Sequence, residues 1–281
     1  MIARAIWLCL AFVLPATAEA GQDCTPRRAT VAEFRRSLEL AAETARQLDR
    51  RGAEVAVLAR VGQDLSRHGL RYSHLGLVYR DRTALGGRGA WRVVHKLNAC
   101  GTDRGTLHRQ GLAQFFSDGL HRFEAGVVIL EPGFVAGLPA HLADNRWLRA
   151  LHEPRYNMLA YPWATRYQQS NQWGLETLAR WLEPTAGDRA AAQRVLRRTG
   201  YRPDTIRVGA IERLGARLGS AHIAFDDQPF ARRMRGRIDT VTVESVFRWL
   251  HRQSLGGPEW RVAPPLGTTF QPLVSRLERT P

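Results

Sequence analysis

Lysine is almost absent from this chain, cysteine is rare, and no membrane-length apolar run follows the first twenty residues. Lys96 is the single lysine, so arginine dominates a formal net charge of +15. The arginines are scattered, apart from a cluster at 232–237, which indicates codon bias and a solvated basic face rather than a nucleic-acid site. The missing apolar runs exclude a membrane-embedded domain after residue 20.

The first twenty residues have the three parts of a cleavable signal peptide. Arg4 is a positive start, 5–14 is an apolar core, and Pro15 ends that core. Small residues at Ala18 and Ala20 then form a cleavage site. The core is shorter than the roughly 20 residues a permanent anchor needs, although an uncut anchor is the alternative. We therefore expect a periplasmic or secreted protein that does not meet nucleic acid.

The cysteine count changes with export, because Cys9 would leave with the signal peptide. Cys24 and Cys100 remain, and an even pair in an oxidising compartment predicts a disulfide. A reactive Cys100 thiolate is the sharper alternative, and it would require Cys24 to be unpaired. Polar residues precede Cys24, so no lipid anchor is expected.

The pattern of apolar residues predicts one α+β domain over 21–253, with a small antiparallel sheet, a helical C-terminal extension, and an irregular tail at 254–281. Helical spacing predicts helices at 31–50, 134–151, 170–182, 188–198, 211–218 and through residue 249. Apolar and β-branched runs predict strands at 54–60, 72–79, 91–97, 123–130 and 240–243.

Three residues suggest nucleophilic catalysis by their order in the chain. His74 lies on one predicted strand, His95 lies on the next, and Ser170 begins a helix. A helix start favours an anionic nucleophile and offers free N–H groups for an oxyanion. His74 would act as base and then acid, with His95 orienting it. The alternatives are two hydrogen-bonded strand histidines and a serine that only caps its helix.

Further polar and aromatic residues flank the helix start. Tyr156, Asn157 and Asn171 are the candidate substrate-binding residues. The asparagines could instead bond to loop backbone, and the aromatic stretch at 156–167 could be core packing. His222 and the following aspartates are too weak a pattern for a metal site, and no cofactor is expected.

The order of these segments resembles the circularly permuted NlpC-type papain-like superfamily, over about residues 60–182. The segments that carry the resemblance are Gly62-Gln63-Asp64, Ser73-His74-Leu75-Gly76, Val93-Val94-His95, Tyr156-Asn157 and Ser170-Asn171-Gln172-Trp173. Ser170 stands where that superfamily has its cysteine. Most of the mature chain also resembles an exported bacterial family, domain of unknown function 2145, on 72–76, 95–100, 156–173 and 239–249.

The superfamily resemblance implies a papain-like core and a hydrolase or acyltransferase that acts on an amide or ester bond of an envelope peptide or lipid. Because a serine hydroxyl is far less acidic than a thiol, a catalytically inactive, envelope-associated binding module on the same fold is the alternative. An envelope peptide, a lipid or an anionic polymer is the expected class of partner. The sequence predicts no oligomeric state.

Overall fold

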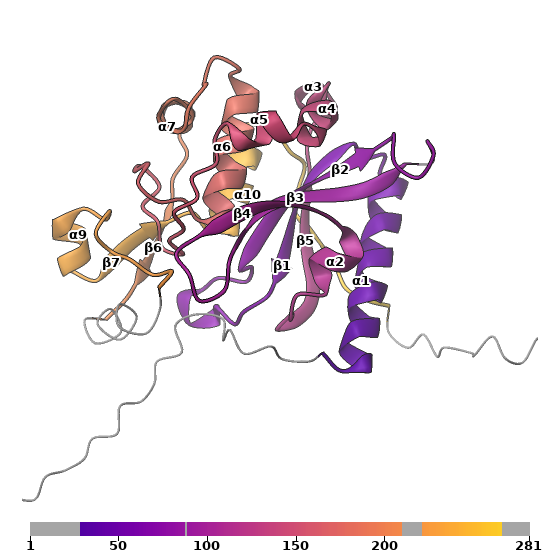
Figure 1. Ribbon diagram of the computed structural model, residues 1–281, viewed down its shortest axis with the longest axis horizontal. Coiled ribbons are helices and arrows are strands. Elements are labelled where there is room, and N and C mark those ends of the chain that lie inside the picture. Colours follow the sequence, from indigo (N-terminus) through magenta and orange to yellow (C-terminus); the bar gives the residue numbers. More distant parts are fainter. Residues whose placement is uncertain (1–28, 88, 210–220, 266–281) are drawn as a thin grey trace, which may run out of the picture.

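A six-stranded antiparallel sheet with helices on both faces forms the centre of the computed structural model, which describes residues 29–87, 89–209 and 221–265 (Figure 1). The strand order is β4-β3-β2-β1-β5-β8, and all neighbours are antiparallel. The sheet strands are β1 (Val55–Val61), β2 (His74–Asp81), β3 (Ala90–Asn98), β4 (Gly105–Gly111), β5 (Arg122–Ile129) and β8 (Trp260–Val262). A separate two-stranded sheet pairs β6 (Asp204–Arg207) with β7 (Arg237–Thr240). The predicted α+β class with a small antiparallel sheet is confirmed.

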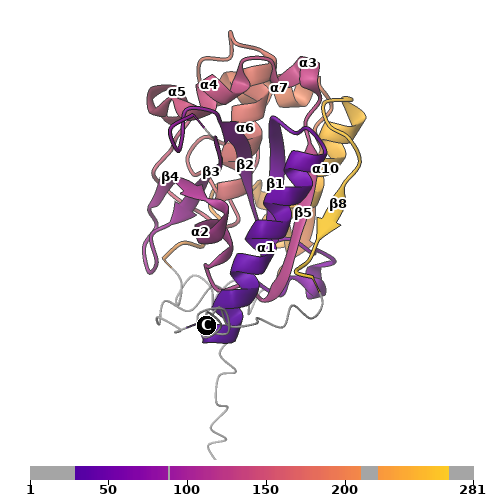
Figure 2. The same cartoon turned by 90° about the vertical axis from the view of Figure 1, so that its right-hand side faces the viewer.

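Helices cover both faces of the large sheet. α1 (Val31–Arg50) begins with a capping box between Thr30 and Glu33, and its buried side chains, among them Leu40 and Leu48, pack in a core with α2 (Leu112–Phe116). Figure 2 shows α1 and α2 on this face and α6 (Ser170–Leu182) behind the sheet. The remaining helices are η1 (Ser66–His68), α3 (Pro132–Val135), α4 (Leu138–Ala143), α5 (Asn145–Arg149), α7 (Arg189–Arg198), α9 (Phe230–Met234) and α10 (Val243–Arg252).

Side chains alternate strictly between the two faces, and this decides where each polar residue of the sheet points. On β2, Leu75 and Leu77 pack in the core that contains Trp173 of α6. Val78 packs in the other core, with Phe115 of α2. Gly174 of α6 is a point of close approach, because a Cβ there would lie 2.6 Å from Leu75 Cδ1.

Several predicted boundaries were wrong, each for a physical reason. The helix expected at 134–151 is divided into α3, α4 and α5, because Gly137 has a left-handed φ of 85° and Asp144 caps a new helix. The strand expected at 240–243 is β7, which ends at Thr240, since Thr242 caps α10. The tail expected to be irregular contains β8, which pairs with β5.

Among the predicted segments, the signal peptide at 1–20 and the helix at 211–218 lie outside the described residues. None of the helices in the described ranges is long and apolar enough to span a bilayer.

Candidate functional site

The structure brings the two predicted histidines into direct contact. His74 Nε2 lies 2.8 Å from His95 Nδ1, although the backbones of β2 and β3 pair only from Leu77 and Val94 onward. Both rings are buried, with His74 8% exposed and His95 0% exposed. The histidine pair therefore joins the two strands where their backbone hydrogen bonds have ended.

A chain of hydrogen bonds fixes the protonation of the histidine pair. His95 Nε2 lies 3.0 Å from Gln110 Oε1 on β4, and because this oxygen is an acceptor, we assign the His95 proton to Nε2. His95 Nδ1 is then an acceptor, and His74 Nε2 donates to it. Together these hydrogen bonds form a relay of two neutral imidazoles, His74 and His95, that ends on the side-chain amide of Gln110.

The surroundings of the pair keep both rings neutral. Burial, followed by the positive charge of Arg60, lowers the pKa of His74 well below its usual value. The same two causes lower the pKa of His95 to about 3, against a smaller opposing effect of the hydrogen bond to Gln110. Arg60 donates to the Phe115 carbonyl oxygen and pairs with Asp118.

Both histidine rings face α2. The centroid of the Phe115 ring is 5.9 Å from that of His74 and 5.2 Å from that of His95. Phe115 belongs to the α1–α2 core, which lies on the sheet face opposite α6. This placement follows from alternation, since the residue after His74 is Leu75, which packs against α6.

Ser170 lies on the other face, as the first residue of α6. Its Oγ is 3.3 Å from the Tyr156 hydroxyl oxygen, and both side chains are buried. The N-cap is Gln169, whose side chain accepts from the Asn171 N–H, so the capping role considered for Ser170 belongs to its neighbour. The sheet therefore separates Ser170 from His74 and His95, and the predicted Ser170–His74 contact does not form.

The three predicted substrate-binding residues are tied into the fold. Asn171 Oδ1 accepts from the Leu75 N–H at 3.0 Å, where β2 has no β3 partner. Asn157 donates to the Ala224 carbonyl and accepts from the Ala224 N–H, joining two loops. Tyr156 is held against Ser170, and burial raises the pKa of its hydroxyl.

A buried ionic network on the α6 face was missed by the sequence analysis. Lys96 Nζ donates to the Glu153 carbonyl, the Gln168 carbonyl and Gln168 Oε1, at 2.6, 2.8 and 3.0 Å. Glu176 of α6, 0% exposed, pairs with Arg189 at 2.8 Å and accepts from Gln168. This network fastens the loop at 153–168 to β3 and α6. The feature of the sequence that could have indicated this network is Lys96, a single lysine inside a predicted strand.

Cys100 is disulfide-bonded in the structure. Its predicted partner, Cys24, lies outside the described residues, so the Cys24–Cys100 pairing stays a prediction. No cluster of three or more metal-ligating side chains occurs within 29–87, 89–209 and 221–265.

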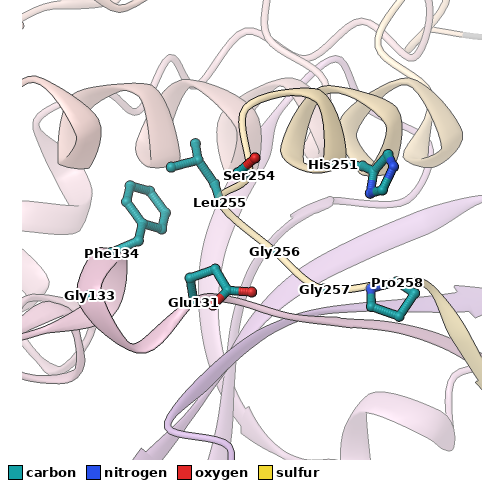
Figure 3. A pocket seen from close by; sticks show the side chains of 9 residues that line it. All are labelled: Glu131, Gly133, Phe134, His251, Ser254, Leu255, Gly256, Gly257 and Pro258. Carbon is teal, nitrogen blue, oxygen red and sulfur yellow. The ribbon is translucent and has the colours of Figure 1, made fainter.

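An open groove lies between the start of α3 and the end of α10 (Figure 3). Its volume is about 750 Å³, within the range of small-ligand sites. Phe134 and Leu255 face each other at one end, and His251 lies with Pro258 at the other (Figure 3). Glu131 adds a carboxylate. None of the predicted site residues lines this groove.

One protein family matches the chain over most of the described structure. The model of the family described as "Uncharacterized protein conserved in bacteria (DUF2145)" matches residues 47–250. The chain belongs to this family. No curated protein and no solved structure matches it.

The DUF2145 match covers the sheet from β1 to β5, the buried network and nearly all of α10. His74, His95 and Ser170 lie inside it. The groove straddles its C-terminal limit, because Glu131 belongs to the matched region and Ser254 to Pro258 do not. The histidine relay is thus a feature of the DUF2145 region, whereas six of the nine residues that line the groove lie in the segment that follows.

Proposed function

We propose that this DUF2145 protein is an exported, non-catalytic binding module of the cell envelope, built on a permuted NlpC-type papain-like core. The order of two histidine strands followed by a polar helix start supports the core. We propose that the module is non-catalytic because His74 and Ser170 lie on opposite faces of the sheet.

Nucleophilic catalysis by a serine requires a base within hydrogen-bond reach. The partner of the Ser170 hydroxyl among the described residues is Tyr156. Because burial raises the pKa of Tyr156, this phenol keeps its proton and cannot accept another from Ser170. The helix dipole alone is a small effect for a hydroxyl of such low acidity.

The histidine relay has a structural role in this proposal. His95 is held by His74 on one side and Gln110 on the other, so all of its ring nitrogens are engaged. Buried polar groups that are fully hydrogen-bonded specify one strand arrangement. The relay therefore links β2 to β3 and β4 beyond the point where the backbone pairing of β2 with β3 has ended.

The groove in Figure 3 is the proposed ligand site. Its lining combines the apolar side chains of Phe134 and Leu255 with the ionisable groups of Glu131 and His251. A lipid chain would favour a wholly apolar lining, whereas a short peptide brings both apolar side chains and polar termini. We therefore assign the groove to an envelope peptide.

Two measurements test the proposal on the exported form, residues 21–281. A fluorophosphonate probe, with mass spectrometry of the Ser170 peptide, tests for an activated serine, and no adduct is expected. Turnover of a panel of amide and ester substrates that disappears in Ser170→Ala would overturn the non-catalytic proposal.

Calorimetric titration with soluble cell-wall peptide fragments tests the groove. Phe134→Ala and His251→Gln should each weaken binding by about tenfold, as for a well-packed interface side chain. Ser170→Ala and His121→Gln, an exposed histidine outside the groove, should bind as the unchanged chain does. Equal binding by the groove variants and these controls would refute the assignment.

A further inference from the structure

The small unit made by α9, β6 and β7 exposes large apolar side chains. Phe230 is 69% exposed and Met234 is 60% exposed. The two residues are four apart on α9, so they lie on the same side of that helix. Figure 1 shows α9 and β7 at one edge of the molecule, away from the large sheet.

The adjoining face of the two-stranded sheet is strongly basic. Arg207 and Arg237 are direct cross-strand partners, so two positive charges stand opposite each other. Like charges in this position destabilise a strand pair. Neither arginine forms an ion pair within the described part of the chain, and both are exposed.

Among the described residues, one carboxylate lies on this face of the two-stranded sheet, and it already has a partner. Asp239 is buried and pairs with Arg232, which reaches across from α9 and also donates to the Thr205 hydroxyl. Arg235, exposed at the C-terminal end of α9, is a third arginine without an ion pair in the described residues. The guanidinium of Arg233 stands over the Phe230 ring, 5.6 Å from its centroid. Positive charge and exposed apolar surface therefore occur together.

We propose that this basic apolar edge, defined by Phe230, Met234, Arg207, Arg235 and Arg237, docks on the surface of an anionic phospholipid bilayer. Phe230 and Met234 would enter the boundary between headgroups and acyl chains. The unpaired arginines would meet lipid phosphates, which removes the repulsion between Arg207 and Arg237. The charge of +15 for the whole chain favours the same surface. This proposal goes beyond the groove, since it uses none of the groove residues.

An anionic polymer could satisfy the arginines, but it gives Phe230 and Met234 nothing apolar to enter. A bilayer satisfies both parts of the edge at once. Phe230 and Met234 should therefore contribute to binding of a bilayer but not to binding of an anionic polymer. The experiment tests this difference.

Cosedimentation of residues 21–281 with phosphatidylcholine vesicles, with and without phosphatidylglycerol, tests the proposal. We expect binding only to the anionic vesicles, and weaker binding as salt is added. Arg235→Gln with Arg237→Gln should weaken binding by about 30-fold at low salt. Phe230→Ala with Met234→Ala should weaken it by at least about tenfold.

The chain offers matched controls for both changes. Phe34→Ala with Leu38→Ala removes another exposed apolar pair four residues apart, on α1. Arg46→Gln with Arg50→Gln lowers the net charge equally, at arginines that pair with Glu43. Both control variants should bind as the unchanged chain does.

Three outcomes would overturn the proposal. One is equal binding to vesicles without phosphatidylglycerol. Another is an equal loss in the test and control arginine variants, which would show that only net charge matters. The third is unchanged binding after loss of Phe230 and Met234, which would favour an anionic polymer. Because these side chains are exposed, unchanged thermal unfolding would show that each variant is folded.

Discussion

Lys96 should make the protein more stable as the pH rises above neutrality, which is unusual for a lysine. Its side chain is 0% exposed, and desolvation lowers its pKa from 10.5 to about 7. Arg189 lowers it further, while Glu176 and Glu153 oppose the shift more weakly. In the unfolded chain the amine regains a pKa near 10.5.

The magnitude follows from the two pKa values. Between pH 7 and 10.5 the unfolded chain binds a proton that the folded protein does not, so the free energy of unfolding rises with pH. The slope approaches about 1.4 kcal/mol per pH unit for one proton. The full difference between the two pKa values corresponds to about 5 kcal/mol, all of it realised only above pH 10.5.

Urea unfolding between pH 7.5 and about 9.5, where few other side chains titrate, measures this slope. Lys96→Met keeps the length of the side chain and removes the titration, so its slope should be flat. Only the slopes are compared, because Lys96→Met also loses the hydrogen bonds that Nζ makes to Glu153 and Gln168.

The single lysine allows a direct check by NMR. Protein labelled with ¹³C-lysine contains one lysine Cε, because Lys96 is the only lysine in the sequence. Its chemical shift should titrate with a midpoint near 7. A midpoint near 10, or equal pH slopes in the unchanged chain and Lys96→Met, would refute the reasoning.

Three further changes test the packing of the sheet and of α6. Below pH 6.5 the histidines of the unfolded chain should bind protons, whereas the buried histidine pair of the folded protein stays neutral. The free energy of unfolding should therefore fall as the pH is lowered. In urea unfolding, His95→Gln should reduce the slope of this free energy against pH. Glu176→Gln should cost about 3–5 kcal/mol in chemical unfolding, because it leaves a buried arginine without its carboxylate. Gly126→Ala should lower the free energy of unfolding by about 1–3 kcal/mol, because the new Cβ would lie 2.5 Å from the Tyr72 ring. Gly133→Ala, where the new Cβ meets open space, should cause no such loss. Thermal unfolding of the two variants measures the difference.

The strands and helices at the centre of the fold were predictable because their patterns are strong. The apolar runs of β1, β2, β3 and β5, and the helical spacing of α1 and α6, were each placed within a few residues. β4 was missed because Gly105–Gly111 is mostly polar, as suits a strand at the edge of the sheet. β8 was missed because three residues carry no periodicity.

The contact between the two histidines was predictable from the sequence, but the face on which they lie was not. β2 and β3 are neighbouring antiparallel strands, and His74 and His95 meet beyond their last backbone pair, Leu77 with Val94. A strand with one polar and one apolar face shows which side is buried. The first six residues of β2 are buried on both sides, so nothing in its pattern tells which face α6 covers.

Alternation along β3 also explains why the order of residues does not guarantee a catalytic geometry. His95 and Lys96 are adjacent, so one must face α2 and the other α6. At the level of Ser170, the face toward α6 presents Leu75 from β2 and Lys96 from β3. Leu75 cannot accept a proton, and the Lys96 amine is committed to three oxygen atoms of the loop that α6 follows. A histidine at either of these two positions would face the α6 side of the sheet, and a shift of a single residue in either histidine strand would place one there.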